Sequence, residues 1–232
     1  MTAPGVAPLR AVLFDAGNTL LFLDYPRLAA VVGQAVGVPL TGTVLAAGAE
    51  EAARAMERRG SDHERAVAFL EALFLEAGVP AARMDVVREC LVRLHGERHL
   101  WSGVASDASE ALARLRDAGL MLGVVSNSDG RVEEALRAAG LRQYFDVVVD
   151  STHAGVEKPD PTIFRAALEA LDVEPGEALY VGDLYEVDVV GANAAGMAAV
   201  LLTGSAAAGE ACATVASLGA LADDLLKERS GP

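Results

Sequence analysis

Residues 11–20 read AVLFDAGNTL: a run of apolar residues ends on the carboxylate of Asp15, and the chain then turns through Gly17 and Asn18. A short apolar run that is bounded by turn residues is typical of a strand that is buried on both faces. Four later runs of the same kind predict four more strands. These runs are LMLGVVS (120–126), FDVVVD (145–150), ALYVGD (178–183) and AAVLL (198–202).

Helical patterns separate these runs. Asp107 and Glu110 have the spacing of a capping box, and Asp160 followed by Pro161 marks the start of another helix. Strands and helices that alternate in this way predict right-handed crossovers and a doubly wound parallel sheet with helices on both faces. The fold class is therefore α/β with a Rossmann-like core. After Gly204 the chain is alanine-rich and polar, and we expect a surface helix there.

The interval from residue 22 to residue 99 breaks the alternation. It holds no convincing strand, only helical stretches such as EEAARAMERR, DHERAVAFLEALFLEAG and MDVVRECLVRL. We therefore expect two domains. Residues 1–21 and 100–232 form the α/β core, and residues 22–99 form a helical domain inserted after the first strand, with linkers near residues 21–25 and 99–107.

Composition narrows the choice of partners. Of the 232 residues 52% are hydrophobic, which allows a sizeable core. The 33 acidic and 19 basic residues give a net charge of −14, which repels nucleic acids and anionic membrane surfaces. Cys90 and Cys212 form no metal or disulfide pattern, and the N-terminus has no signal-peptide pattern. We expect a cytoplasmic protein, either a monomer or a homodimer.

Polar side chains stand where the predicted strands end. Asp15 ends the first strand, Ser126 the second and Asp183 the fourth, and Lys158 lies in the loop HAGVEKPDP after the third. Each of them alone is an ordinary turn or cap residue. Ligands of parallel sheets, however, bind beyond the carboxyl ends of the strands. Together the four residues bring a nucleophile, a hydroxyl donor, a cation and a second carboxylate to one crevice.

The motifs resemble those of the haloacid dehalogenase superfamily. FDAGNTL is similar to the first motif, VVSNS to the second, EKPDP to the third and VGDLYEVDVVGANAAGM to the fourth, in the same order. The helical insertion resembles the C1-type cap of that superfamily. The resemblance implies a magnesium-dependent hydrolase of the phosphatase-like branch, acting on a small phosphorylated metabolite.

The resemblance also implies roles for the catalytic and substrate-binding residues. Asp15 would attack phosphorus and become an aspartyl phosphate. Ser126 would donate a hydrogen bond to the transferring group, and Lys158 would neutralise charge on the nucleophile and the phosphoryl oxygens. Ser126, Asn127 and Lys158 would contact the substrate.

A magnesium site is implied in the same way. Its ligands would be Asp15, the backbone carbonyl of Gly17 and Asp183, with Asp188 in support. Charge agrees with this assignment, because an anionic nucleophile and an anionic phosphoryl group repel each other. A hard cation with oxygen ligands would reduce that repulsion.

Gly17 departs from the pattern of the superfamily. Most of its phosphatases carry a second aspartate there, as general acid and then base, and such a group is worth ~10²–10⁴-fold in rate. Phosphonatases also lack it, but they use a cap lysine, and residues 22–99 contain no lysine. Haloacid dehalogenases use no metal, which leaves the acids of GDLYEVD without an evident purpose.

Several interpretations of Gly17 stay open. In the first interpretation, the resemblance implies a phosphatase-like site that is slow, restricted to good leaving groups, or served by an acid from the insertion such as Asp62, His63 or Glu64. The alternatives are a dehalogenase that hydrolyses carbon–halogen bonds and a catalytically weak or inactive protein with a binding or regulatory role.

His95 and His99 in HGERH have the spacing of zinc-binding helices. The glutamate is not where zinc motifs place it, and Gly96 weakens a helix. We interpret the segment as an exposed hinge rather than a metal site.

Overall fold

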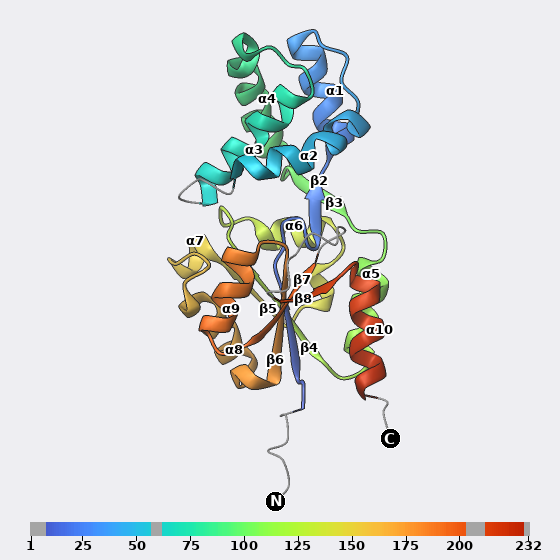
Figure 1. Ribbon diagram of the computed structural model, residues 1–232, viewed down its shortest axis with the longest axis vertical. Coiled ribbons are helices and arrows are strands. Elements are labelled where there is room, and N and C mark those ends of the chain that lie inside the picture. The colour runs from blue at the N-terminus through green and yellow to red at the C-terminus, as the bar shows by residue number, and fades with distance from the viewer. Residues whose placement is uncertain (1–7, 57–61, 203–211, 230–232) are drawn as a thin grey trace, which may run out of the picture. The chain divides into compact units, whose positions relative to one another are not determined.

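The computed structural model describes residues 8–56, 62–202 and 212–229 of the chain (Figure 1). These residues fall into two compact units. One unit takes its described residues from Met1–Phe22 and Gly103–Pro232, and the other spans Leu23–Ser102. The first is an α/β unit and the second is a helical unit.

The α/β unit is built on a six-stranded sheet in which every neighbouring pair is parallel. This confirms the predicted α/β fold with a doubly wound core. In spatial order the strands are β5 (Val147–Asp150), β4 (Met121–Ser126), β1 (Ala11–Phe14), β6 (Ala178–Gly182), β7 (Ala198–Leu202) and β8 (Ala213–Val215).

Strand β1 lies inside the sheet, between β4 and β6. Phe14, its last residue, pairs with Val124 of β4 and Val181 of β6. All four residues of β1 are fully buried, which explains why the segment is uniformly apolar. The chain leaves β1 towards β4 and later returns to the other side of β1 as β6. A change of direction of this kind opens a crevice beyond the carboxyl ends of the two strands.

Helices cover both faces of the sheet. Figure 1 shows α5 and α10 on one side and α8 and α9 on the other. The helices of this unit are α5 (Ala108–Asp117), α6 (Val132–Ala138), α7 (Ser151–Ala154), α8 (Pro161–Leu171), α9 (Val190–Ala194) and α10 (Leu218–Arg229). A π-helical turn at Tyr185–Val189 directly precedes α9.

Of the two predicted helix starts, the one at Asp160 is confirmed and the capping box at Asp107 is not. Asp160 caps α8 by accepting a bond from Thr162 N at 2.8 Å, as expected. The capping box expected at Asp107 and Glu110 is wrong. Asp107 makes no side-chain bond within α5, because its carboxylate accepts a bond from Gly219 N at the start of α10, at 2.8 Å.

In its described residues, the helical unit packs four α-helices around its own apolar cluster. Leu28, Val32, Leu45, Leu73 and Phe74 lie in this cluster and are fully buried. The helices are α1 (Tyr25–Val36), α2 (Gly42–Met56), α3 (Asp62–Glu76) and α4 (Met84–Glu97). In the part of the chain that the structure describes, no helix is both long and apolar enough to cross a membrane.

Two expectations about strands need correction. Strands β2 (Leu21–Leu23) and β3 (Trp101–Val104) pair with each other in a small sheet, where we expected linkers without strands. In the tail, β8 precedes α10, where we expected only a helix; residues 203–211 of that tail lie outside the described residues. None of these three strands is uniformly buried, in contrast to β1, so the apolar pattern that marks a buried strand is weaker there.

Candidate active site

The carboxyl edge of the sheet brings three carboxylates together. Asp15 directly follows β1, and its backbone N donates to Val181 O at 2.8 Å, which extends the pairing with β6. Asp183 directly follows β6, and Asp188 lies in the turn after it. Oxygen atoms of Asp15, Asp183 and Asp188 all lie within 4.8 Å of one another. The structure thus groups the acidic residues that the sequence assigned to a metal site.

Lys158 is the cation of this group. Its Nζ donates to Asp15 Oδ1 at 2.6 Å and to Asp188 Oδ1 at 2.7 Å, with only 2% of the side chain exposed. Asn127 holds the lysine backbone from both sides, because it accepts from Lys158 N at 2.7 Å and donates to Lys158 O at 3.1 Å. Asn127, which we expected to contact substrate, therefore fixes the loop that carries the lysine.

Asp188 is held rigidly. Its Oδ2 accepts bonds from the backbone N of Asp183 at 3.1 Å and of Leu184 at 2.9 Å, while Oδ1 faces Lys158. A Cβ at Gly182 would overlap the Asp188 carboxyl group, so this geometry requires glycine before Asp183. Both oxygens of Asp188 are engaged in hydrogen bonds, which suits a supporting role better than that of a primary metal ligand.

Burial is the largest single influence on the pKa values of Asp15, Asp183 and Lys158. It raises the pKa of Asp15 to about 6, against the opposing effect of Lys158, and the charge of Asp188 adds to the rise. Burial, and then the charges of Asp15 and Asp188, raise the pKa of Asp183 well above its ordinary range. Burial lowers the pKa of Lys158, but the charges of Asp15 and Asp188 outweigh it and keep that pKa well above its usual value.

A hard cation fits this donor set. Three carboxylates lie around one ammonium group. Burial is the main cause of the raised pKa values of Asp15 and Asp183, and a bound cation would favour the ionised form of both. Magnesium prefers carboxylate and carbonyl oxygens. The acidic group could therefore hold a metal ion.

Ser126 and Gly17 complete the predicted set. Ser126 is the last residue of β4 and is buried, and its Oγ makes one long bond, 3.4 Å, to Asn127 O. Gly17 lies in the turn after Asp15. Among the described residues, the glycines with positive φ run from Gly37 to Gly196 and do not include Gly17, so its backbone conformation also suits a residue with a side chain.

Two residues near the carboxylates were missed in the sequence. Tyr180 of β6 lies below Lys158, with its hydroxyl oxygen 3.0 Å from Nζ. Asn18 donates to Asp183 Oδ2 at 3.4 Å, from a backbone with φ of 53°. The hydroxyl of a buried tyrosine needs a partner, but the sequence around Tyr180 does not indicate which residue supplies it.

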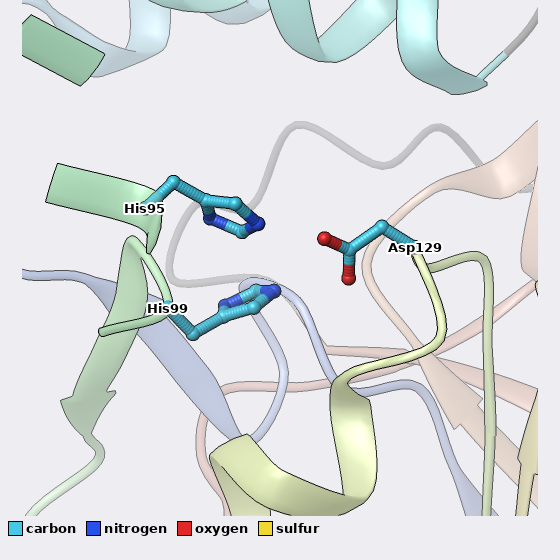
Figure 2. A group of neighbouring side chains, drawn as sticks. All are labelled: His95, His99 and Asp129. Carbon is cyan, nitrogen blue, oxygen red and sulfur yellow. The ribbon is translucent and has the colours of Figure 1, made fainter. Parts of the chain in front are cut away.

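The histidines of HGERH belong to the helical unit. Figure 2 shows the rings of His95 and His99 beside each other, and their centroids are 4.8 Å apart. His99 lies beyond the end of α4, and its Nδ1 accepts from Trp101 N at 3.2 Å. Both histidine side chains are half-buried, whereas Gly96, Glu97 and Arg98 between them are exposed as expected; the hinge stays a prediction. Asp129, also drawn in Figure 2, belongs to the α/β unit.

The candidate replacement acids, Asp62, His63 and Glu64, also belong to the helical unit. Glu64 is exposed near the start of α3. The side chains of Asp62 and His63 lie outside the described residues. None of the three is assigned a role by the geometry.

A parallel α/β unit with an acidic group beyond β1 and β6, and a helical unit inserted after β1, defines the class of haloacid dehalogenase-like folds. A family model described as "Hydrolase: haloacid dehalogenase-like hydrolase" matches residues 9–196. The chain belongs to this family, and it is an enzyme of the hydrolase class with a phosphatase-like site.

Individual relatives agree with this assignment. A Bos taurus protein named haloacid dehalogenase-like hydrolase domain-containing protein 3 is 34% identical over 208 residues, which cover 84% of this chain and 82% of the relative. A glyceraldehyde 3-phosphate phosphatase of Methanopyrus kandleri is 31% identical over 203 residues, which cover 83% of each chain. The solved structure of a HAD phosphatase from Thermococcus onnurineus has a TM-score of 0.61 and 28% identity, covering 96% of this chain and 99% of that one.

Proposed function

We propose that this protein is a magnesium-dependent phosphatase that hydrolyses a small phosphorylated metabolite through an aspartyl phosphate on Asp15. The observation that carries the proposal is the buried ammonium of Lys158, 2.6 Å from Asp15 and 2.7 Å from Asp188. A carboxylate nucleophile must stay ionised while it approaches an anionic phosphoryl group. A fixed cation beside it favours the ionised carboxylate and reduces the repulsion between the two anions. Relatives named as phosphatases, such as that of Methanopyrus kandleri, support a phosphorylated substrate.

The reaction has two steps. In the first, an oxygen of Asp15 forms a bond to phosphorus, the bond from phosphorus to the leaving oxygen breaks, and that oxygen takes up a proton from solvent. In the second, water forms a bond to phosphorus and releases a proton to solvent, the bond from phosphorus to Asp15 breaks, and inorganic phosphate leaves. The hydroxyl of Ser126 would donate a hydrogen bond to a phosphoryl oxygen. This bond would replace the long one, 3.4 Å, that it makes to Asn127 O.

Magnesium would be held by Asp15, Asp183 and the carbonyl of Gly17. When bound, it would offset the charge of the phosphoryl oxygens. Asp188 would orient Asp183 through the backbone amide that it binds at 3.1 Å. The three N–H groups of Lys158 have oxygen partners within the protein, so a contact with substrate would require one of these bonds to exchange.

Gly17 shapes the substrate preference that we propose. The first motif has no acidic side chain at position 17 that could protonate a leaving group. Acyl phosphates have leaving groups that need little protonation and should react well, whereas alkyl phosphates should react poorly. The same glycine favours a second candidate function, a binding or regulatory protein with weak turnover.

The proposal extends to domain roles and location. The helical unit, which we predict at residues 22–99, would be the cap that selects the substrate, and its support is the position of the insertion directly after β1. A cytoplasmic location is supported by the absence of a disulfide, since Cys90 and Cys212 are both free. A monomer or homodimer stays the prediction.

A panel of acyl phosphates and phosphomonoesters, assayed with magnesium and with EDTA, tests the proposal. We expect phosphate release from acetyl phosphate that requires magnesium and is lost in Asp15→Asn. If no compound releases phosphate but vanadate binds with magnesium present, the binding function is correct instead. Release that is equally fast in EDTA would contradict the metal requirement.

A further inference from the structure

The hydroxyl of Tyr180 needs an explanation. The side chain is fully buried within β6, and Phe164 packs against its ring edge to face, with centroids 4.9 Å apart. Phenylalanine would fill the same space and would bring no polar atom into the core. A buried hydroxyl is retained at a cost unless it is fully hydrogen-bonded. The role of this residue therefore lies in the hydroxyl oxygen.

The Tyr180 hydroxyl lies between strand β4, which carries Val125, and the loop that carries Lys158. It donates to Val125 O at 2.9 Å, one residue before Ser126, and its oxygen accepts from Lys158 Nζ at 3.0 Å. Asp188 Oδ1 is also near, at 3.3 Å. The hydroxyl proton can be donated to Val125 O or to Asp188 Oδ1, and with either acceptor the lone pairs of the oxygen remain for the lysine.

Lys158 has three N–H donors, and three oxygens surround its nitrogen. They belong to Asp15 at 2.6 Å, Asp188 at 2.7 Å and Tyr180 at 3.0 Å. A lysine side chain has four flexible bonds and little directional preference of its own. With all three donors matched, the ammonium has one preferred position. Without the third acceptor, a buried N–H would be unsatisfied, and the ammonium would shift away from Asp15 or Asp188.

We propose that Tyr180 is a positioning residue that holds the ammonium of Lys158 against Asp15 and Asp188 through its phenol oxygen. It acts through the lysine and does not touch the substrate. The inference rests on the proposed function for its kinetic consequence only. The geometric consequence can be measured in the protein without metal or substrate.

The chain offers a direct probe, because Lys158 and Lys227 are its only lysines. In metal-free protein labelled with ¹⁵Nζ-lysine, two ammonium groups can contribute signals. Lys227 is 76% exposed, so its protons should exchange too fast to be seen, whereas Lys158 should give a protected signal. In Tyr180→Phe we expect the ammonium protons of Lys158 to exchange at least about tenfold faster, the factor that matches one lost hydrogen bond to a charged group.

The kinetic readout uses acetyl phosphate with magnesium. Tyr180→Phe should lower kcat about tenfold and leave KM within about twofold, because the nucleophile is misplaced while substrate contacts remain. Tyr144→Phe is the matched control; it removes a phenol hydroxyl in the same unit, outside the lysine site, and should change neither readout. Circular dichroism and melting curves establish that each variant is folded.

Three outcomes decide the matter. Unchanged exchange at Lys158 in a folded Tyr180→Phe protein overturns the proposal, whatever the activity. Wild-type exchange at Lys158 as fast as at Lys227 overturns it as well, even if the variant does not fold. Faster exchange in the variant supports the positioning role, and if the wild type then hydrolyses no phosphate, only the proposed function has failed.

Discussion

Replacing Asp15 by asparagine should stabilise the metal-free protein at neutral pH while it removes the nucleophile. Burial raises the pKa of Asp15 from 3.8 to about 6, so the folded chain binds this proton more tightly than the unfolded chain does. A group with a raised pKa contributes stability that is full below the unfolded value and is lost as pH rises through the folded value. Stability from this group is therefore lost between pH 3.8 and about 6.

The magnitude follows from the same shift. A rise from 3.8 to about 6 corresponds to about 3 kcal/mol, at ~1.36 kcal/mol per pKa unit. Asparagine keeps the shape of the side chain and carries no charge. The free energy of unfolding of Asp15→Asn should exceed that of the wild type by about 3 kcal/mol at pH 8 and by about half as much at pH 5.

Urea unfolding in EDTA at the two pH values is the assay. Asp223→Asn provides a control of opposite sign, because a hydrogen bond from Arg114 lowers the pKa of Asp223. Stability from such a group is present above the unfolded pKa, so this variant should be less stable than the wild type at pH 8. A lower stability of Asp15→Asn than of the wild type at pH 8 would refute this reasoning. A difference in the free energy of unfolding that does not grow between pH 5 and pH 8 would refute it as well, because burial would then not be the main influence on the pKa of Asp15.

Three further predictions concern the reaction, the metal and the linkers. Gly17→Asp should raise steady turnover of alkyl phosphates by up to ~10²–10⁴-fold, the range of general acid–base catalysis; quenched flow with acetyl phosphate should show a burst in the wild type and none in the variant, and a wild type that turns over sugar phosphates rapidly without a burst would contradict the account. Magnesium should bind with a calorimetric signal that Asp15→Asn combined with Asp183→Asn abolishes; unchanged binding in the double variant would rule out this site. Hydrogen exchange should be faster in β2 and β3 than in β1, because two short strands protect their amides less than a central strand does; equal protection would count against mobile linkers.

Continuous apolar runs bounded by turn residues made most of the fold predictable. β1, β4, β6 and β7 lie where the sequence indicates them, because burial on both faces of a parallel sheet requires such runs. β2, β3 and β8 were missed because none of them is uniformly buried, and each is defined by its pairing partner. The capping box at Asp107 was wrong for a similar reason, since its partner Gly219 is 112 residues away in the sequence.

The candidate site also contains residues that the sequence indicates and one that it does not. The places of Asp15, Ser126 and Asp183 at the carboxyl edge of the sheet were predictable, because each of them stands at the end of an apolar run. Tyr180 was not, because in ALYVGD it has the place of an ordinary core residue. Its contact with Lys158 depends on where a loop residue 22 positions away directs its side chain, and no local pattern reports that.

The two lysines also differ in their chemistry towards acylating reagents. Such reagents attack neutral amines, and Lys158 is both buried and held in its protonated form by two carboxylates. Lys227 has 76% of its side chain exposed near the end of α10. An N-hydroxysuccinimide ester should therefore attach a fluorophore or a surface tether to the side chain of Lys227 and leave that of Lys158 unmodified. Of the two lysine side chains, the protein thus presents one, that of Lys227, as a conjugation point that takes no part in the carboxylate site.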